Sequence, residues 1–201
     1  EYDLDFCCGG SDTLSNAAAE KGLNLAEIET RLTVLQNSKA ENPEEYWVGA
    51  NYGEVIDHIL VRYHQRHREQ LQELIVLADR VESVHGDRDD CPIGVAAELR
   101  NVYEDLSNHM MKEEHVLFPM IKAGNYMMAQ MPIRMMEMEH AEHGEHLDVL
   151  KSLTNNMTPP ADACNTWRAL YSGIQEFADD LMMHIHRENN ILFPRVIAEN
   201  H

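Results

Sequence analysis

The chain has 201 residues, enough for one sizeable hydrophobic core or for one core with a small appended unit. It carries 16 Lys and Arg residues against 35 Asp and Glu residues, a formal net charge of −19. This acidity argues against a general nucleic-acid-binding surface and against docking on an anionic membrane. No apolar run is long enough to span a bilayer, so we expect neither nucleic acid nor membrane among the partners.

Residues 1–45 are predicted to form a small helical N-terminal domain. Ser11 or Asp12 can cap a first helix that ends at Gly22, and Asn24 can cap a second one. A polar segment containing a proline follows and is typical of a linker. The chain has no initiator Met, so we expect further residues before its first one.

Residues 46–201 are predicted to form an all-α, up-down-up-down four-helix bundle, because apolar residues recur at helical spacing and the connections are short. Pro119 and Pro194 are expected to kink or end their helices. The Met-rich run 127–138 is expected to fill the core, with a soft-metal site as the alternative. The expected helices span residues 53–85, 94–122, 132–155 and 162–198.

One phrase occurs twice in this region. Residues 109–119 read HMMKEEHVLFP and residues 184–194 read HIHRENNILFP, and both fit His-x3-Glu-x3-Leu-Phe-Pro. A weaker pair repeats His-x2-His-x3-Leu, beginning at His64 and again at His140. The offsets are 75 and 76 residues, which indicates an internally duplicated helix pair. The two LFP segments are expected to pack as apolar plugs that frame a site.

The repeats supply six candidate metal ligands. A His and a Glu four residues apart lie on one face of a helix, so each repeat can present two donors to one point. Six ligands exceed the four of a structural zinc site, and imidazole with carboxylate but no thiolate suits iron or manganese. Two carboxylates among four imidazoles predict a two-metal site in which each Glu bridges. The candidates are His64, His109, Glu113, His140, His184 and Glu188.

The sequence leaves alternative roles for three residues near the candidate ligands. His67 and His143 lie three residues after His64 and His140, so each either supports a ligand or is an alternative ligand. Glu139 is expected on the surface, with steering of small molecules or protons as the alternative. For any single His, a solvated helix face is the ordinary interpretation, and it is the whole set that predicts a metal site.

Four cysteines in a chain of this size do not make a disulfide framework, so we expect a reducing, cytoplasmic location. Cys7 and Cys8 are adjacent and precede two glycines. Vicinal thiols before a helix N-terminus have a lowered pKa, which favours a transfer or redox role for this pair. Two ordinary thiols at a turn are the alternative.

Several segments resemble a known family. YDLDFCCGG, DHILVRYHQRHREQL, SNHMMKEEHVLFPMIK and ENNILFPR are similar to the hemerythrin-like iron-sulfur cluster repair proteins, the YtfE, RIC and ScdA group. The resemblance covers essentially the whole chain. It implies a small ScdA-like domain followed by a hemerythrin-like bundle with two iron ions. By position, the ligands of the family fall on the six candidates named above, with Glu113, Glu188 and an oxo or hydroxo group as bridges.

The resemblance also implies a function. Members of this group restore iron-sulfur clusters damaged by nitrosative or oxidative stress, and we expect this protein to do so by donating iron, with Cys7 and Cys8 assisting the transfer. Reduction of nitric oxide to nitrous oxide, and sensing of oxygen or nitric oxide, are the alternatives. The expected partners are damaged iron-sulfur proteins and the diatomic molecules nitric oxide and oxygen, and a homodimer stays open.

Overall fold

The computed structural model describes residues 13–37 and 43–199, and within them it is built of helices and connecting turns. Cys7, Cys8, Ser11 and Asp12 lie outside the described residues. In chain order the helical elements, with η marking π-helical segments, are α1 (Leu14–Glu20), α2 (Leu25–Asn37), α3 (Pro43–Gly49), α4 (Tyr52–Ile59), η1 (Leu60–His64), α5 (Gln65–His85), α6 (Val95–Lys112), η2 (Glu113–Leu117), α7 (Phe118–Lys122), α8 (Tyr126–Leu153), α9 (Asn165–His186), η3 (Arg187–Leu192) and α10 (Phe193–Ala198).

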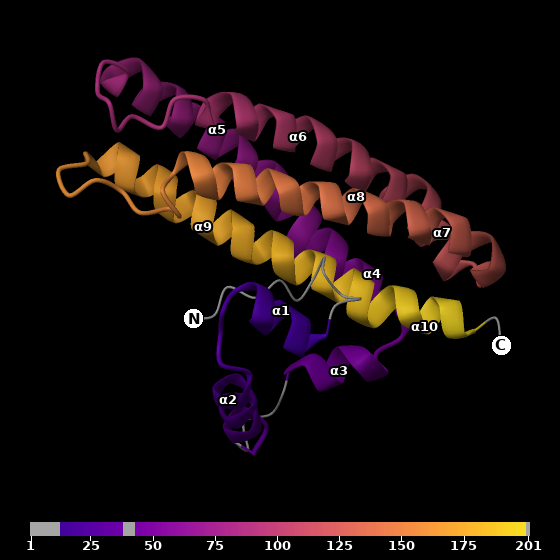
Figure 1. Ribbon diagram of the computed structural model, residues 1–201. Coiled ribbons are helices and arrows are strands. Elements are labelled where there is room, and N and C mark those ends of the chain that lie inside the picture. The colour runs from indigo at the N-terminus through magenta and orange to yellow at the C-terminus, as the bar shows by residue number, and fades with distance from the viewer. Residues whose placement is uncertain (1–12, 38–42, 200–201) are drawn as a thin grey trace.

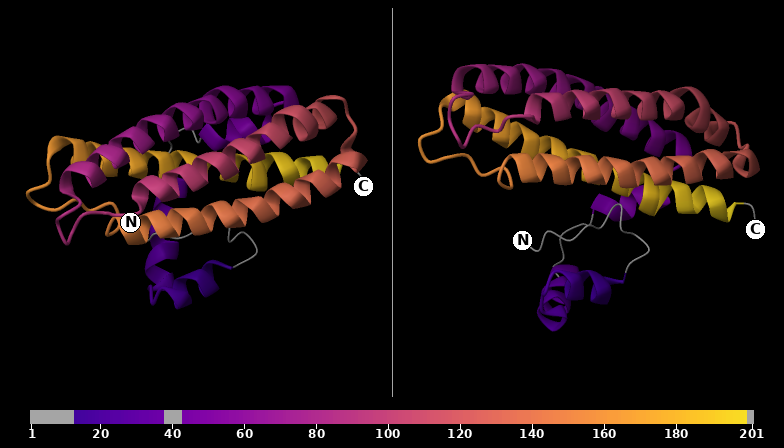
Figure 2. Two further views of the ribbon diagram at one scale, coloured as in Figure 1. Left: turned by 90° about the horizontal axis from the view of Figure 1, so that it is seen from above. Right: turned by 45° about the horizontal axis from the view of Figure 1, so that its top comes forward.

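Four long helices form an antiparallel bundle, and the predicted all-α, up-down-up-down arrangement is confirmed (Figures 1 and 2). The first is continuous through α4, η1 and α5, and the second through α6, η2 and α7. The third is α8 alone, and the fourth runs through α9, η3 and α10. No described helix is long and apolar enough to cross a membrane.

The bundle core consists of two hydrophobic clusters. One is formed by α5, α6, the second half of α8, and α9, with Trp167 and Phe177 fully buried in it. The other is formed by α4, α7, α10 and the first half of α8, with Phe118 and Phe193 among its members. Both clusters exclude water, so polar groups lying between them are shielded from solvent. All six candidate ligands lie at this boundary.

The N-terminal helices begin where side-chain oxygens can cap them. Asn24 caps α2 as predicted, since its Oδ1 accepts from the backbone N–H of Ala26 at 3.1 Å. The predicted cap of α1 at Ser11 or Asp12 was wrong, because Thr13 takes that position and its hydroxyl accepts from the N–H of Asn16 at 3.2 Å. Gly22 follows the end of α1 with a φ of +63°, a conformation that favours glycine.

Helix α3 is tied to the bundle through Trp47. Its ring stacks on His58 of α4 at 4.1 Å between centroids, and the guanidinium of Arg187 lies 5.2 Å from the ring. Arg195 of α10 also donates to the backbone carbonyl of Trp47 at 3.0 Å. These contacts join α3 to the bundle, while the division of the chain at residue 45 stays a prediction.

Pro119 and Pro194, which were expected to kink or end their helices, do not end them. Each proline is preceded by a π-helical turn, and the helix then continues through α7 and α10. The N–H of Phe118 bonds to the carbonyl of Glu113, and that of Phe193 to the carbonyl of Glu188, five residues back. In a regular α-helix the proline ring would clash with the carbonyl four residues back. The wider π turn relieves that clash.

Helix α8 begins at Tyr126 rather than at residue 132 and contains Pro132. The carbonyl that loses its helical partner there belongs to Met128, an exposed residue, so water can hydrate it.

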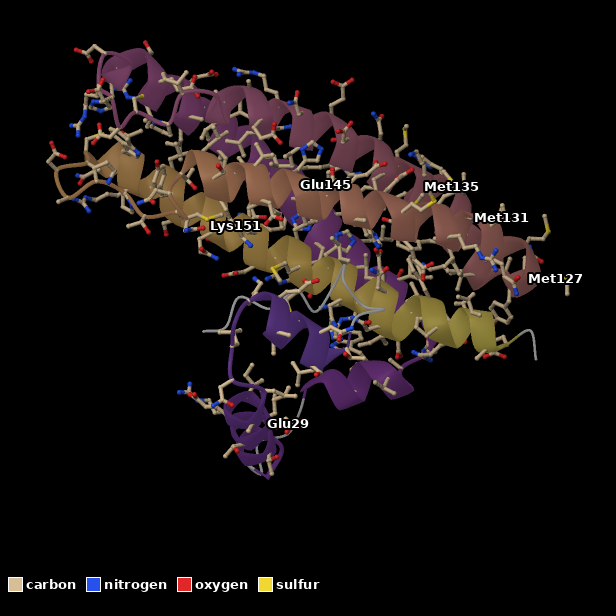
Figure 3. The ribbon with its side chains drawn as sticks, viewed as in Figure 1. Glu29, Met127, Met131, Met135, Glu145 and Lys151 are labelled. Carbon is tan, nitrogen blue, oxygen red and sulfur yellow. The ribbon has the colours of Figure 1, made fainter. Side chains whose placement is uncertain are left out.

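The Met-rich run, residues 127–138, does not fill the core, because only Met136 of its six methionines is buried. Met127, Met131 and Met135 point outward along α8 (Figure 3).

Candidate metal centre

The four histidines and two glutamates of the repeats meet at one buried place, and each is at most 1% exposed. Two groups have ligand atoms within 4.8 Å of one another: His64, Glu113, His184 and Glu188, and His109, Glu113, His140 and Glu188. Both glutamates belong to both groups. The centre therefore offers two tetrads of donors, each with two imidazoles and the same two carboxylates.

The Nε2 atoms of the histidines point at each other and at the carboxylates. Those of His64 and His184 are 3.2 Å apart, and those of His109 and His140 are 3.1 Å apart. Imidazole nitrogens lie 3.1 to 3.4 Å from the oxygens of Glu113 and Glu188. Such convergence of lone-pair atoms suits a cation between them.

His64 is oriented by a pair of charged residues at its other ring nitrogen. Its Nδ1–H donates to Glu114 Oε1 at 2.8 Å, and Arg68 donates to the same oxygen at 2.7 Å. Because a carboxylate only accepts, Nδ1 carries a proton, and in the neutral ring the Nε2 lone pair faces the centre. The arrangement is the one that fixes the ring and tautomer of a metal-binding histidine.

His109 has a similar arrangement. Its Nδ1–H donates to Glu139 Oε2 at 2.9 Å, and Lys112 donates to Glu139 Oε1 at 2.6 Å. Glu139, which was expected on the surface, is only partly exposed, at 16% of its side chain, and binds a candidate ligand. Burial against α6 is the reason: the carboxylate satisfies the N–H of His109 there.

His140 is oriented by an amide, because its Nδ1–H donates to Asn189 Oδ1 at 2.8 Å. Glu114 and Asn189, which the sequence did not single out, each directly follow a ligand glutamate. By the internal duplication, they orient the two histidines at equivalent positions, His64 and His140. Because both occupy the same position in the two copies of the repeated phrase, the sequence could have pointed to them as supporting residues. No hydrogen-bond partner is seen among the described residues for Nδ1 of His184.

The buried charges of the centre compensate one another. Burial and the neighbouring Glu188 raise the pKa of Glu113, but His109 and His64 outweigh them and hold it at about 2. Burial lowers the pKa of His109, yet the negative charge of Glu113, whose oxygen lies 3.4 Å from the ring, raises it to about 10. His64, beside Glu113 and Glu114, has a pKa raised to about 8 despite its burial. Without metal, the centre is thus held together by protons on histidine.

The residues present fit a pair of metal ions. Both oxygens of Glu113 and Oε2 of Glu188 are buried and make no hydrogen bond of acceptable geometry among the described residues. A buried carboxylate costs several kcal/mol unless a cation pairs with it, and metal ions would take that role from the protonated histidines. Four imidazoles and two carboxylates suit iron, manganese or zinc. The ligand role of the six residues remains a prediction.

Aromatic rings close the centre from one side, which confirms the expectation for the two LFP segments. Phe118 stacks on His64 with 5.8 Å between centroids, and Phe193 stacks on His140 with 6.0 Å. Leu117 and Leu192 are buried beside them. These plugs separate the imidazoles from the end of the bundle and belong to the second hydrophobic cluster.

His67 and His143 also lie in the interior, 0% and 3% exposed, but neither belongs to a tetrad. His67 is 5.2 Å from the ring of His184, and His143 is 4.9 Å from that of His109. Burial lowers the pKa of His143 to about 2 and that of His67 well below its usual value. Both rings are therefore neutral next to the centre.

Comparison with known families gives two matches. Residues 55–196 match the hemerythrin HHE cation-binding domain, which covers the bundle and all six candidate ligands. Residues 1–36 match ScdA_N, described as a domain of unknown function. The two matches fall on either side of the predicted boundary at residue 45.

Close relatives carry consistent names. A Haemophilus influenzae protein named a probable iron-sulfur cluster repair protein is 69% identical, over 99% of this chain and 89% of its own length. Proteins named iron-sulfur cluster repair protein YtfE are 56% identical in Musicola paradisiaca and 55% identical in Escherichia coli, each over 98% of this chain. The chain belongs to the hemerythrin HHE cation-binding family and, within it, to the YtfE group of iron-sulfur cluster repair proteins.

Proposed function

We propose that this protein repairs damaged iron-sulfur clusters with a di-iron centre that donates iron. The observation that carries the proposal is the pair of buried tetrads that share Glu113 and Glu188. The names of the relatives support the repair function. The shared carboxylates support two metal ions at neighbouring positions rather than one.

In this proposal His64 and His184 hold one iron, and His109 and His140 hold the other. Glu113 and Glu188 bridge the two, together with an oxo or hydroxo group. The iron pair supplies labile coordination and redox chemistry that side chains lack. The residues around it fix the imidazoles, exclude bulk water and compensate charge.

The charges of the metal-free centre favour release of iron. The pKa of His109 is about 10 and that of His64 about 8, so both take up protons at neutral pH once the metal is gone. These protons keep Glu113 paired after iron leaves. Glu114 and Glu139, whose side chains are 23% and 16% exposed, connect the two imidazoles with the surface. Iron release is then coupled to proton uptake.

We further propose that the partners are iron-sulfur proteins of the cytoplasm whose clusters have been damaged, and that nitric oxide and oxygen bind at the iron pair. Cys7 and Cys8 are proposed to assist transfer of iron. Replacing both with Ser should leave two irons per chain but slow repair. Unchanged repair by that variant would remove the cysteines from the mechanism.

The function is tested by restoring a nitric-oxide-damaged [4Fe–4S] enzyme with iron-loaded protein under anaerobic conditions. A chelator that binds free iron but cannot strip the loaded protein separates donation from leakage. We expect the wild-type protein to restore activity, and the Glu113→Leu variant to fail. Failure of the wild type while free ferrous iron succeeds without chelator would contradict repair. Catalytic formation of nitrous oxide in its place would favour the reductase function.

A further inference from the structure

His67 is a buried histidine beside the centre whose two ring nitrogens have different surroundings. Its Nδ1 lies 3.4 Å from Gln70 Oε1. Its Nε2 is buried and has no hydrogen-bond partner among the described residues. An imidazole nitrogen in this state is costly to bury, so a partner outside the protein chain is expected for it.

A chain of hydrogen bonds decides which nitrogen of His67 carries the proton. Arg62, on the surface, donates two hydrogen bonds to Asp180, at 2.5 and 3.2 Å. Asp180 also accepts from Gln70 Nε2 at 3.1 Å, which turns the Gln70 oxygen toward His67. That oxygen can only accept, so Nδ1 of His67 bears the hydrogen. The Nε2 of His67 is therefore left with a free lone pair.

The second half of the bundle lacks this chain. His143 stands at the position equivalent to His67, and both of its nitrogens are buried without partners among the described residues. The position equivalent to Gln70 is His146, whose ring nitrogens instead bind Glu98 and Asp105, away from the centre. Among the described residues, the half of the centre formed by His64 and His184 thus has a neighbouring imidazole, His67, whose tautomer is fixed, and the half formed by His109 and His140 does not.

Direct binding of a metal by His67 is not supported by the geometry. His67 contributes no atom to either group of donors within 4.8 Å of one another. Its ring nevertheless lies next to His184, at 5.2 Å between centroids. The ring of His67 therefore borders the half of the centre that His64 and His184 form.

We propose that His67 Nε2 accepts a hydrogen bond from a protonated oxygen ligand, water or hydroxide, bound to the metal held by His64 and His184. This inference rests on the proposed two-metal centre. It gives His67 a role in selecting which small ligands bind to the metal. A ligand that can donate a proton is favoured there. A ligand that cannot, such as azide, gains nothing from His67.

The test uses the iron-loaded full chain and azide as the probe. Iron content is measured first, followed by azide titration in the visible spectrum of the ferric pair. We compare wild type with His67→Phe, which removes the acceptor, and His67→Gln, whose amide oxygen can accept. Gln70→Leu removes the fixed tautomer without touching His67, and His146→Phe serves as a matched control on the surface.

With two irons retained, we expect His67→Phe to bind azide roughly 5- to 10-fold more tightly, the effect of losing one hydrogen bond to the displaced water. Gln70→Leu should shift the affinity in the same direction, and His67→Gln should restore it toward wild type. Wild-type azide affinity in His67→Phe would overturn the inference, as would loss of iron from that variant. A wild-type protein that binds fewer than two irons would instead overturn the proposed centre, and the inference with it.

Discussion

Glu113 and Glu188 are fully buried carboxylates with imidazole nitrogens 3.1 to 3.4 Å away. In the metal-free protein, protons on His64 and His109 compensate their charge. A metal pair would replace those protons. The same six side chains thus suit two states, so a metal pair could leave the centre without leaving bare buried charge.

Replacing either of the two shared glutamates should empty both proposed metal positions, because each carboxylate belongs to both tetrads. For Glu113→Leu or Glu188→Leu we expect fewer than one iron per chain and a lower melting temperature of the iron-loaded protein. His146→Ala, a change on the surface, should keep both irons. Elemental analysis beside the protein concentration gives the answer. Two irons in both glutamate variants would show the assignment to be wrong.

The metal-free protein should lose stability as pH rises. The pKa of His109 is about 10 when folded, against about 6.5 when unfolded. Its contribution is therefore fully present below pH 6.5 and is lost as pH approaches 10. Urea midpoints with a chelator present, from pH 7 to 9.5, should fall in wild type and fall less in His109→Gln. A wild-type midpoint that climbs over this range would contradict the proton-held centre.

At the residue scale, the two repeats together predicted which six residues converge, because periodicity fixes the helix face and duplication fixes the partner. The residues that bind the Nδ1 atoms of these histidines were harder to predict from the sequence. Glu139 was expected on the surface, since a helix pattern does not show that its neighbour α6 carries an unsatisfied N–H at that level. For His67, the fixed tautomer depends on Gln70 and Asp180, which come from two helices that are distant in sequence.

At the element scale, three π turns interrupt the helices next to the ligands. His64 ends η1, Glu113 begins η2, and Glu188 is the second residue of η3. A π turn inserts one extra residue into a helix, and such turns are frequent at functional sites. Here the turns let the ligand side chains meet while the flanking α-helices keep their apolar faces inward.

Removing the extra residue should separate folding from metal binding. We consider deletion of Val116, an exposed residue of η2, combined with Pro119→Ala so that a regular helix is tolerated. Phe118 and Ile121 keep their register in the core, so we expect a helical, cooperatively melting protein. Glu113 changes its direction, so fewer than one metal per chain should bind.

The matched control deletes Glu137, an exposed residue within regular α8. That deletion rotates one half of the helix by about 100° against the other and should destabilise the fold. Circular dichroism and metal content are measured for both variants. Full metal binding by the Val116 deletion would show that η2 does not position Glu113.

The sequence predicted the number and order of the bundle helices but not their π turns or the start of α8. Pro119 and Pro194 were expected to kink or end their helices, whereas each helix continues after a π turn that accommodates the proline ring. The third helix was expected to begin at residue 132, whereas α8 contains Pro132 and the carbonyl that this proline leaves unpaired is at the solvent. The helix propensity of a residue does not show that a π turn or solvent can accommodate a proline in the folded protein.

At the scale of the whole molecule, two hydrophobic clusters flank a polar centre. The clusters can hold the bundle without metal, so we expect the chelated protein to stay helical. Metal binds only the folded centre, so loading at a hundredfold above Kd should add about 2.7 kcal/mol per site. For a domain of this size the melting temperature should rise by roughly 5 °C or more. Identical melting curves with and without iron would contradict a buried metal centre.

The central claim is that iron leaves this centre for a damaged cluster, and labelled iron tests it most directly. The protein is loaded with ⁵⁷Fe and mixed anaerobically with a damaged [4Fe–4S] protein of natural iron, and the Mössbauer spectrum of the separated client is recorded. We predict the ⁵⁷Fe signal in the restored cluster, with a matching loss from the donor and no transfer from metal-depleted Glu113→Leu. A restored cluster without ⁵⁷Fe would contradict donation by this centre.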